Sequence, residues 1–346
     1  MKMRRILVPG AAIALLLVGT LPVSAHSVTV SNVNSYAVTV LQTNTSDPDL
    51  VNGWGLSRGP ATPWWVSDNG TDKSTLYNGI GTKLGLVVTI PGGAPTGTVF
   101  NGNPASFNGD PFLFDSEAGI ISAWRGALGT AAEVGTDQSA RHAVYKGLAI
   151  GTLKGKDYLY ATDFHNNRID VFNSTFVLQQ WAGAFKDPKL PHHYAPFGIQ
   201  NLNGRIFVTY AKQQAGSDDE KAGQGLGIVD MYRVDGKFLA RVGTFGVLNA
   251  PWGLAMAPTH FGRFNGDLIV GNFGDGRLHA FHWDGHHWHL AGTLLKANHN
   301  SVRIKGLWAI AFGGGTANNG SLNALYYAAG PNDEAGGAFG TITFAR

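Results

Sequence analysis

The residues best suited to acid and base chemistry lie just after a run of β-forming residues near the middle of the chain. His165 stands between Asp163 and Asn166, so a neighbouring carboxylate could hold its imidazole as a general base near neutral pH. Asp163 and His165 are therefore the candidate catalytic residues. A histidine held in a turn, with no catalytic duty, is the alternative that the pattern leaves open.

Side-chain oxygens recur at equivalent places, after similar β-forming runs elsewhere in the chain. Oxygen ligands that converge from several strands are what Ca²⁺ needs, because this ion takes six to eight of them. The candidate metal ligands are Asn69, Glu117, Asn166, Asn272 and Asn332. Asp and Asn also form Asx turns and tolerate left-handed backbone, so calcium binding and simple turn formation both remain open.

Charged residues at the same or neighbouring positions form a third candidate set, for contacts with a small ligand. These are Asp68, Lys146, Lys212, Asp275, Lys305, Asp333 and Glu334. The lysines could bind an anionic ligand or balance the neighbouring acids. Charge balancing is the simpler interpretation, and binding of an anionic ligand is the alternative.

An internal repeat predicts the elements that position these residues. A glycine followed by apolar residues opens six units, at Gly55, Gly97, Gly147, Gly198, Gly253 and Gly306. The units recur at intervals of roughly 50 residues, and most contain four β-forming segments, as in a β-propeller blade. The sixth unit ends after its third strand, and the spare segment Ala37–Leu41 is predicted to complete it.

We therefore predict an all-β, six-bladed β-propeller whose ring is closed by an N-terminal strand, with residues 26–346 forming one domain. In a propeller, the loops that enter the inner strands and the loops that join second to third strands lie on one face. The candidate residues would then gather at the polar rim of the central channel. A register error of one residue would reverse the facing of any of them.

The first 25 residues predict a signal peptide. A basic start, Met1–Arg5, precedes the apolar run Ile6–Leu21, and cleavage is expected after Ala25, which leaves an exported protein, periplasmic or extracellular. Removal of Lys2, Arg4 and Arg5 leaves 23 basic against 23 acidic residues (26 − 3 = 23), so nucleic-acid binding is not expected. No later segment is long and apolar enough for an integral membrane span, and we expect a monomer.

Four strings resemble an uncharacterised family of exported bacterial propeller proteins: Pro251–Ala255, Gly271–Arg277, Ala161–Asn166 and Ala329–Glu334. The resemblance spans essentially the whole mature chain and implies the propeller fold and export, but no activity. More distantly, the units are similar to NHL-type repeats and to calcium-dependent six-bladed lactonases and esterases of the gluconolactonase class. That likeness concerns the fold, which does not imply function.

The leading function expected is binding of a small ligand or cation at the rim. The alternatives are a Ca²⁺-dependent hydrolase of a small ester or lactone, and an extracytoplasmic protein-interaction scaffold, so enzymatic activity stays open. Outside the rim, five histidines crowd a hairpin around Asp284–Gly285, either as ordinary surface residues or as a transition-metal patch: His279, His282, His286, His287 and His289.

Overall fold

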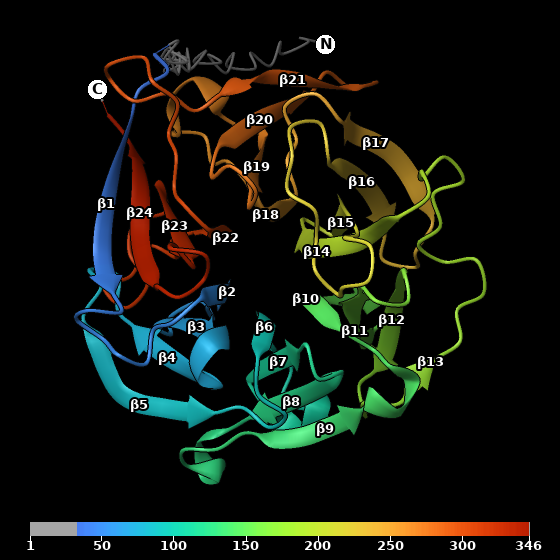
Figure 1. Ribbon diagram of the computed structural model, residues 1–346. Helices are drawn as coiled ribbons and strands as arrows, with labels where there is room; N and C mark the ends of the chain where they lie inside the picture. The colour runs from blue at the N-terminus through green and yellow to red at the C-terminus, as the bar shows by residue number, and fades with distance from the viewer. Residues whose placement is uncertain (1–32, 346) are drawn as a thin grey trace, which may run out of the picture. The chain divides into compact units, whose positions relative to one another are not determined.

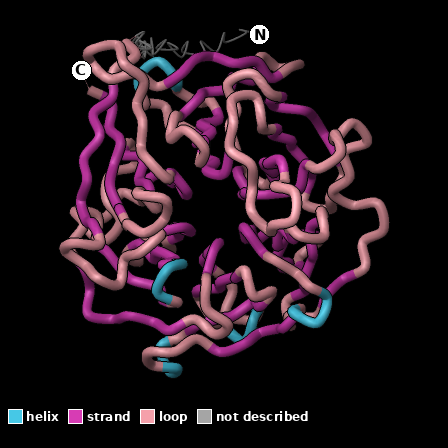
Figure 2. Tube along the Cα trace, viewed as in Figure 1, coloured by secondary structure: helices cyan, strands magenta, loops and turns pink. Residues whose placement is uncertain are grey.

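Six four-stranded antiparallel sheets surround a central channel in residues 33–345, the part of the chain that the computed structural model describes (Figure 1). The predicted six-bladed β-propeller is confirmed. Figure 2 shows that the helical residues form only short turns between strands and loops. The predicted signal peptide lies outside the described residues, and within residues 33–345 no helix could cross a membrane.

The blades follow one another along the chain, each from its inner to its outer strand. The first three are β2 (Gly53–Ser57), β3 (Trp64–Asp68), β4 (Lys73–Tyr77) and β5 (Lys83–Thr89); β6 (Pro95–Phe100), β7 (Phe112–Ser116), β8 (Ile120–Trp124) and β9 (Glu133–Asp137); and β10 (Tyr145–Leu153), β11 (Lys156–Asp163), β12 (Arg168–Asn173) and β13 (Leu178–Gln179). The next two are β14 (Tyr194–Leu202), β15 (Arg205–Lys212), β16 (Ile228–Arg233) and β17 (Phe238–Thr244); and β18 (Pro251–Met256), β19 (Leu268–Asn272), β20 (Leu278–Trp283) and β21 (Trp288–Thr293).

The sixth blade joins the two ends of the described chain. It consists of β22 (Leu307–Phe312), β23 (Ala324–Ala329), β24 (Ala338–Phe344) and, as outer strand, β1 (Tyr36–Thr43). Tyr36 pairs with Phe344 and Thr43 with Ala338. The predicted closure by an N-terminal strand is confirmed, and it protects a sheet edge that would otherwise be exposed.

The repeated glycine lets neighbouring inner strands touch. A Cβ atom on Gly55 would lie 2.3 Å from the carbonyl oxygen of Thr96 in the next blade, and one on Gly198 would lie 2.2 Å from that of Trp252. The sixth unit departs from the prediction, because Gly306 precedes β22. The residue equivalent to the other glycines is Ala309, since Ile310 resumes the pairing with Tyr327 after the strand irregularity.

The core lies between blades. Leu113 of the second blade packs with Leu159 and Phe172 of the third, and all three are fully buried. Burying one such side chain contributes about 1.5–3 kcal/mol. Packing between blades therefore fixes the strands that carry the loops around the channel.

Candidate functional site

Two rings of side chains from the inner strands close the channel. The ring nearer the beginnings of these strands contains Trp54, Thr96, Lys146, Phe197, Trp252 and Trp308. Its aromatic side chains contact one another. Trp54 stacks on Trp308 with ring centroids 3.5 Å apart, and the centroids of Phe197 and Trp308 are 5.8 Å apart. The indole nitrogen of Trp252 donates to the carbonyl of Lys146 at 2.7 Å.

The second ring is mostly aliphatic and lies two residues further along each strand. It consists of Leu56, Thr98, Leu148, Ile199, Leu254 and Ile310. A space of about 10 Å³ lies between this ring and Trp252, at the lower limit of what one water molecule needs. The channel is therefore plugged, and its two ends are separate pockets: an upper mouth, where the inner strands begin, and a lower mouth, where they end.

The upper mouth carries a continuous polar network. Asn52 donates to Glu334 Oε2 at 2.7 Å and to Asn69 Oδ1 at 3.2 Å. Asn69 in turn donates to Glu117 Oε2 at 3.0 Å, and Lys146 Nζ donates to Glu117 Oε1 at 2.5 Å. The network thus links loops and strands of the first, second, third and sixth blades.

The fourth blade adds two acids beside the buried Lys146, through the loop of residues 213–227. Asp219 Oδ1 lies 3.7 Å from Lys146 Nζ, and Glu220 acts on the lysine electrostatically. Burial alone would lower the pKa of Lys146, but the carboxylates of Glu117, Glu220 and Asp219 outweigh it and raise this pKa. Burial raises the pKa of Glu220 to about 7, and it also raises the pKa of Glu334. The mouth therefore holds one deeply buried cation among several acids.

A pocket of about 680 Å³ opens beside this network, between the fifth and sixth blades. Phe273 lines it and stacks on Trp308, with centroids 3.9 Å apart. Its charged and amide side chains are Asp275, Arg303, Lys305, Asn332, Asp333 and Glu334. An aromatic face, hydrogen-bond acceptors and cationic donors therefore line one space.

The turn that supplies Glu334 has an unusual backbone. Asn332, Asp333 and Glu334 have φ angles of 60°, 50° and 66°. Left-handed backbone costs an L-residue roughly 1–2 kcal/mol, so three in succession require the surroundings to hold them. The amide of Gly336 donates to the carbonyl of Pro331, and Asn52 holds the Glu334 carboxylate. Strain of this kind clusters at binding sites.

The structure brings together many of the predicted rim residues. Asp275, Lys305, Asn332, Asp333 and Glu334 line the 680 Å³ pocket. The neighbouring network contains the predicted residues Asn69, Glu117 and Lys146.

The predicted catalytic pair does not form. Asp163 is fully buried, accepts a hydrogen bond from Asn166 and pairs with Arg168 at 3.0 Å. His165 Nδ1 instead lies 2.5 Å from Asp218 Oδ1, in an exposed pair. The reason is that Asp163, the last residue of β11, turns into the blade, whereas His165 lies in the following turn and faces solvent.

Two further predicted ligand contacts lie elsewhere. Asp68 is fully buried at the end of β3, where burial raises its pKa well above the ordinary value. Lys212 lines a separate pocket of about 710 Å³ together with His165, His193 and Lys221. Neither side chain reaches the 680 Å³ pocket.

The five predicted calcium ligands do not make one set. Asn272 accepts from the amide of Asn249 and donates to the carbonyl of Val247, which is turn stabilisation. Asn166 likewise donates to the carbonyl of Arg141. Within residues 33–345 no group of three or more His, Asp or Glu side chains is placed to hold a metal ion. Asn166 and Asn272 are thus engaged in their own turns, whereas Asn69 and Glu117 are hydrogen-bonded to each other, and calcium binding stays a prediction.

Sequence reasoning missed the acids Asp219 and Glu220 and the aromatic Phe273. A signal for the acids existed, because the connection between β15 and β16 runs over residues 213–227 and carries consecutive acids. Unusually long loops often carry function. Phe273 had no comparable signal, because its stacking on Trp308 joins residues of two different blades.

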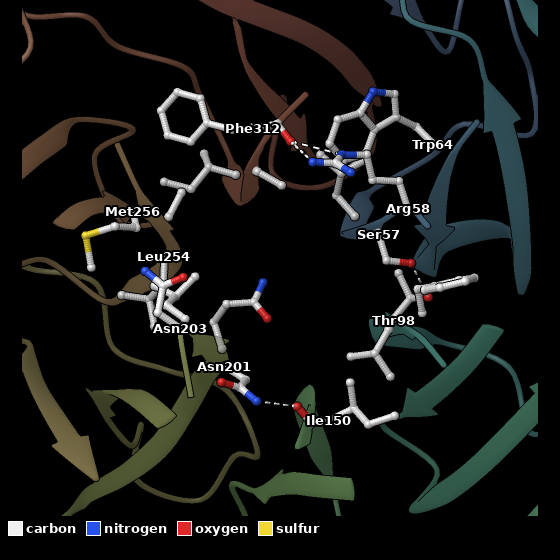
Figure 3. Close-up of a pocket in the computed structure, with 18 residues that line it drawn as sticks. Ser57, Arg58, Trp64, Thr98, Ile150, Asn201, Asn203, Leu254, Met256 and Phe312 are labelled. Carbon is white, nitrogen blue, oxygen red and sulfur yellow. Dashed lines mark hydrogen bonds between the residues drawn. The ribbon is translucent and has the colours of Figure 1, made fainter. Parts of the chain in front are cut away.

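The lower mouth is a pocket of about 530 Å³ with a different character. Figure 3 shows Arg58, Asn201, Met256 and Phe312 around its central space. Arg58 is the one charged residue among the described residues that line it. Its guanidinium donates to the carbonyls of Phe312 and Gly313 at 2.9 Å. Arg58 therefore ties the first blade to the sixth.

These features define the class of protein: a six-bladed β-propeller with a plugged channel and a polar pocket at one mouth. No family model matches the sequence. An uncharacterised protein of Acanthamoeba polyphaga mimivirus is 30% identical over 317 residues, which cover 86% of this chain and 76% of the relative. The chain belongs to the same family as this viral protein.

A second uncharacterised protein of the same virus is 29% identical over 287 residues, covering 77% of this chain and 74% of that protein. Both relatives are viral, so the bacterial membership implied by the resemblance finds no support in them. Their descriptions assign no activity.

Solved structures with other activities share the fold. A glucose dehydrogenase has a TM-score of 0.58 at 14% identity, over 90% of this chain and 100% of that one. A virginiamycin B lyase from Staphylococcus aureus has a TM-score of 0.53 at 13% identity, over the same shares of the two chains. Likeness at such identities establishes the fold alone.

Proposed function

We propose that this protein is an exported propeller that binds a small, hydroxyl-rich ligand of the sugar class at its upper mouth. The observation that carries the proposal is the 680 Å³ pocket in which Phe273, Glu334 and Lys305 meet. Export rests on the predicted signal peptide of residues 1–25.

The pocket supports this ligand class through its mixture of groups. The carboxylates of Asp275, Asp333 and Glu334 accept hydrogen bonds from hydroxyl groups, and Arg303 and Lys305 donate to them. Phe273 offers an aromatic face to the carbon–hydrogen side of a sugar ring. Trp308, fully buried behind it, keeps that face in place.

The other two functions have weaker support. A Ca²⁺-dependent hydrolase needs converging oxygen ligands, and two of the predicted ones, Asn166 and Asn272, are engaged in separate turns. No catalytic step follows from them. A scaffold is expected to present a broad apolar surface, whereas the features that distinguish this molecule are polar and gather at the upper mouth.

The test is a thermal-shift measurement on residues 26–346 with millimolar glucose, galactose, mannose and N-acetylglucosamine. A ligand that binds only the folded state raises the melting temperature by mass action. We expect at least one sugar to raise it, and we expect Phe273→Ala and Glu334→Gln to remove that rise.

Arg58→Met at the lower mouth is the matched control and should keep the rise. If no sugar in this set changes the melting temperature, or if the rise survives Phe273→Ala, the proposed ligand class is wrong.

A further inference from the structure

The outer hairpin of the fifth blade holds two histidines directly opposite each other. His282 of β20 pairs in register with His289 of β21. Their ring centroids lie 5.2 Å apart with planes at 61°, and both side chains are about half exposed, at 49% and 52%. The two imidazoles therefore meet on an accessible face.

This separation is the one that a shared metal ion requires. A Zn–N bond of about 2.0–2.1 Å, plus about 1.1 Å from the nitrogen to the ring centre, places each centroid about 3.2 Å from the ion. Two rings at a tetrahedral angle around one ion then have centroids about 5.2 Å apart. The observed centroid spacing of 5.2 Å therefore matches that of two imidazoles on one ion.

Each imidazole has a carboxylate on the side of Nδ1. Asp267 Oδ1 lies 2.6 Å from His282 Nδ1, and Asp284 Oδ2 lies 4.0 Å from His289 Nδ1. The Asp267 side chain is only 5% exposed, so its position is fixed by packing. A neutral imidazole that donates its Nδ1 hydrogen to a carboxylate keeps a lone pair on Nε2. Asp267 is close enough to orient His282 in this way, as carboxylates orient metal-binding histidines, whereas 4.0 Å is too long for a hydrogen bond between His289 and Asp284.

Two more possible ligands lie beside the adjoining turn. Asp284 and His287 flank the turn between β20 and β21, where the amide of Asp284 donates to the carbonyl of His287, and Asp284 Oδ2 lies 4.0 Å from His289 Nδ1. Asp284 Oδ1 is already engaged, because it accepts from the amides of His286 and His287. Among the described residues no three such groups are already placed around a metal, so water would complete the coordination.

We infer that His282 and His289 form a binding site for a first-row transition ion that favours imidazole, such as Zn²⁺ or Cu²⁺. The site lies on the outer strands and is independent of the sugar pocket proposed above. Ca²⁺ prefers oxygen ligands and does not bind this pair.

The test is calorimetric titration of ZnCl₂ into chelator-treated residues 26–346, prepared without a polyhistidine tag. We expect one Zn²⁺ per chain at this site, with affinity lowered at least about 10-fold in His282→Ala and in His289→Ala. Asp267→Asn should lower it about 10–100-fold while both ligands remain, as expected for a group that orients a ligand.

The matched control is His142→Ala with His165→Ala. This second exposed histidine pair has centroids 6.3 Å apart and an exposed partner, Asp218. The control should keep the Zn²⁺ affinity. Loss of binding in the control and retention in His282→Ala would overturn the inference, as would the absence of Zn²⁺ binding to the wild type. Melting curves without metal separate loss of the site from loss of folding.

Discussion

The two mouths of the channel are built by the same six inner strands, yet they differ in chemistry. The upper mouth holds Lys146 among carboxylates, including Glu117 and Glu334, beside a strained turn. The lower mouth holds Arg58, which is bound by backbone carbonyls, with no acid among its described lining residues. The strands are common to both mouths, and one of them, β10, supplies Lys146, whereas Glu117 and Glu334 lie in loops. The upper mouth therefore combines one strand residue with acids from the irregular connections.

The largest expected effect tests whether the buried charge of Lys146 stabilises the acids of the upper mouth. Lys146→Met leaves Glu117 and its neighbouring acids without their buried cation, so the free energy of unfolding should fall by about 3–5 kcal/mol. Urea unfolding measures the loss. Glu117→Gln in the same chain should restore part of it.

Lys305→Met is the control, because Lys305 is exposed at the same mouth and its loss should change stability by less than about 0.5 kcal/mol. Equal effects at the two lysines would mean that burial of Lys146 does not organise the mouth.

The next effect tests the plug that separates the mouths. Ile199→Ala removes a side chain of the aliphatic ring and leaves a cavity, so unfolding free energy should fall by about 2–4 kcal/mol. Val134→Ala, at a position that is 51% exposed, should have little effect. A plug that tolerates Ile199→Ala would indicate that the channel can collapse around the gap.

The third effect concerns pH and is confined to the upper mouth. Burial raises the pKa of Glu220 to about 7, so the unfolded chain ionises this group at lower pH than the folded chain does. Stabilisation from the protonated group is therefore lost as pH rises through 7. Between pH 6 and pH 8 the free energy of unfolding of the wild type should fall by about 1 kcal/mol more than that of Glu220→Gln.

Asp115 and Asp230 also have pKa values raised by burial to about 7, but they titrate in both proteins and cancel in the difference. Chemical unfolding of the wild type and of Glu220→Gln at both pH values measures this difference in unfolding free energy. Parallel stability curves would contradict the burial of Glu220.

The smallest effect tests where backbone strain is stored. Asp333→Gly at φ 50° should stabilise the fold by about 0.5 kcal/mol, because glycine accepts left-handed backbone but loses more entropy on folding. Asn203→Gly at the lower mouth, φ 54°, should change stability less, since Asn tolerates this region. Melting temperatures of the two variants compare the mouths directly. A larger gain in stability from Asn203→Gly than from Asp333→Gly would mean that the strain lies at the lower mouth and not at the upper one.

The fold was predictable because the repeat is visible in the spacing of its glycines. Five of the six, from Gly55 to Gly253, lie within inner strands, and the spare segment Ala37–Leu41 lies within β1. The sixth unit was misaligned at Gly306 because Ala309 occupies the close-contact position. Several rim residues were predictable from their place after a second strand, as with Glu117. The direction of the side chains was not predictable. Asp163 points into its blade, and His165 contacts Asp218, which lies in another loop. Contacts between distant loops leave no periodic signal.

The pairing of β1 with β24 also constrains how the molecule can be made. Tyr36 and Phe344 are partners, although nearly the whole described chain separates them. A growing chain therefore holds an incomplete sixth blade until Phe344 has been synthesised, and the slow, long-range closure comes last. Until then the exposed edges of β24 and β1 can pair with the wrong strand, which makes the interval before closure the period of greatest risk of aggregation.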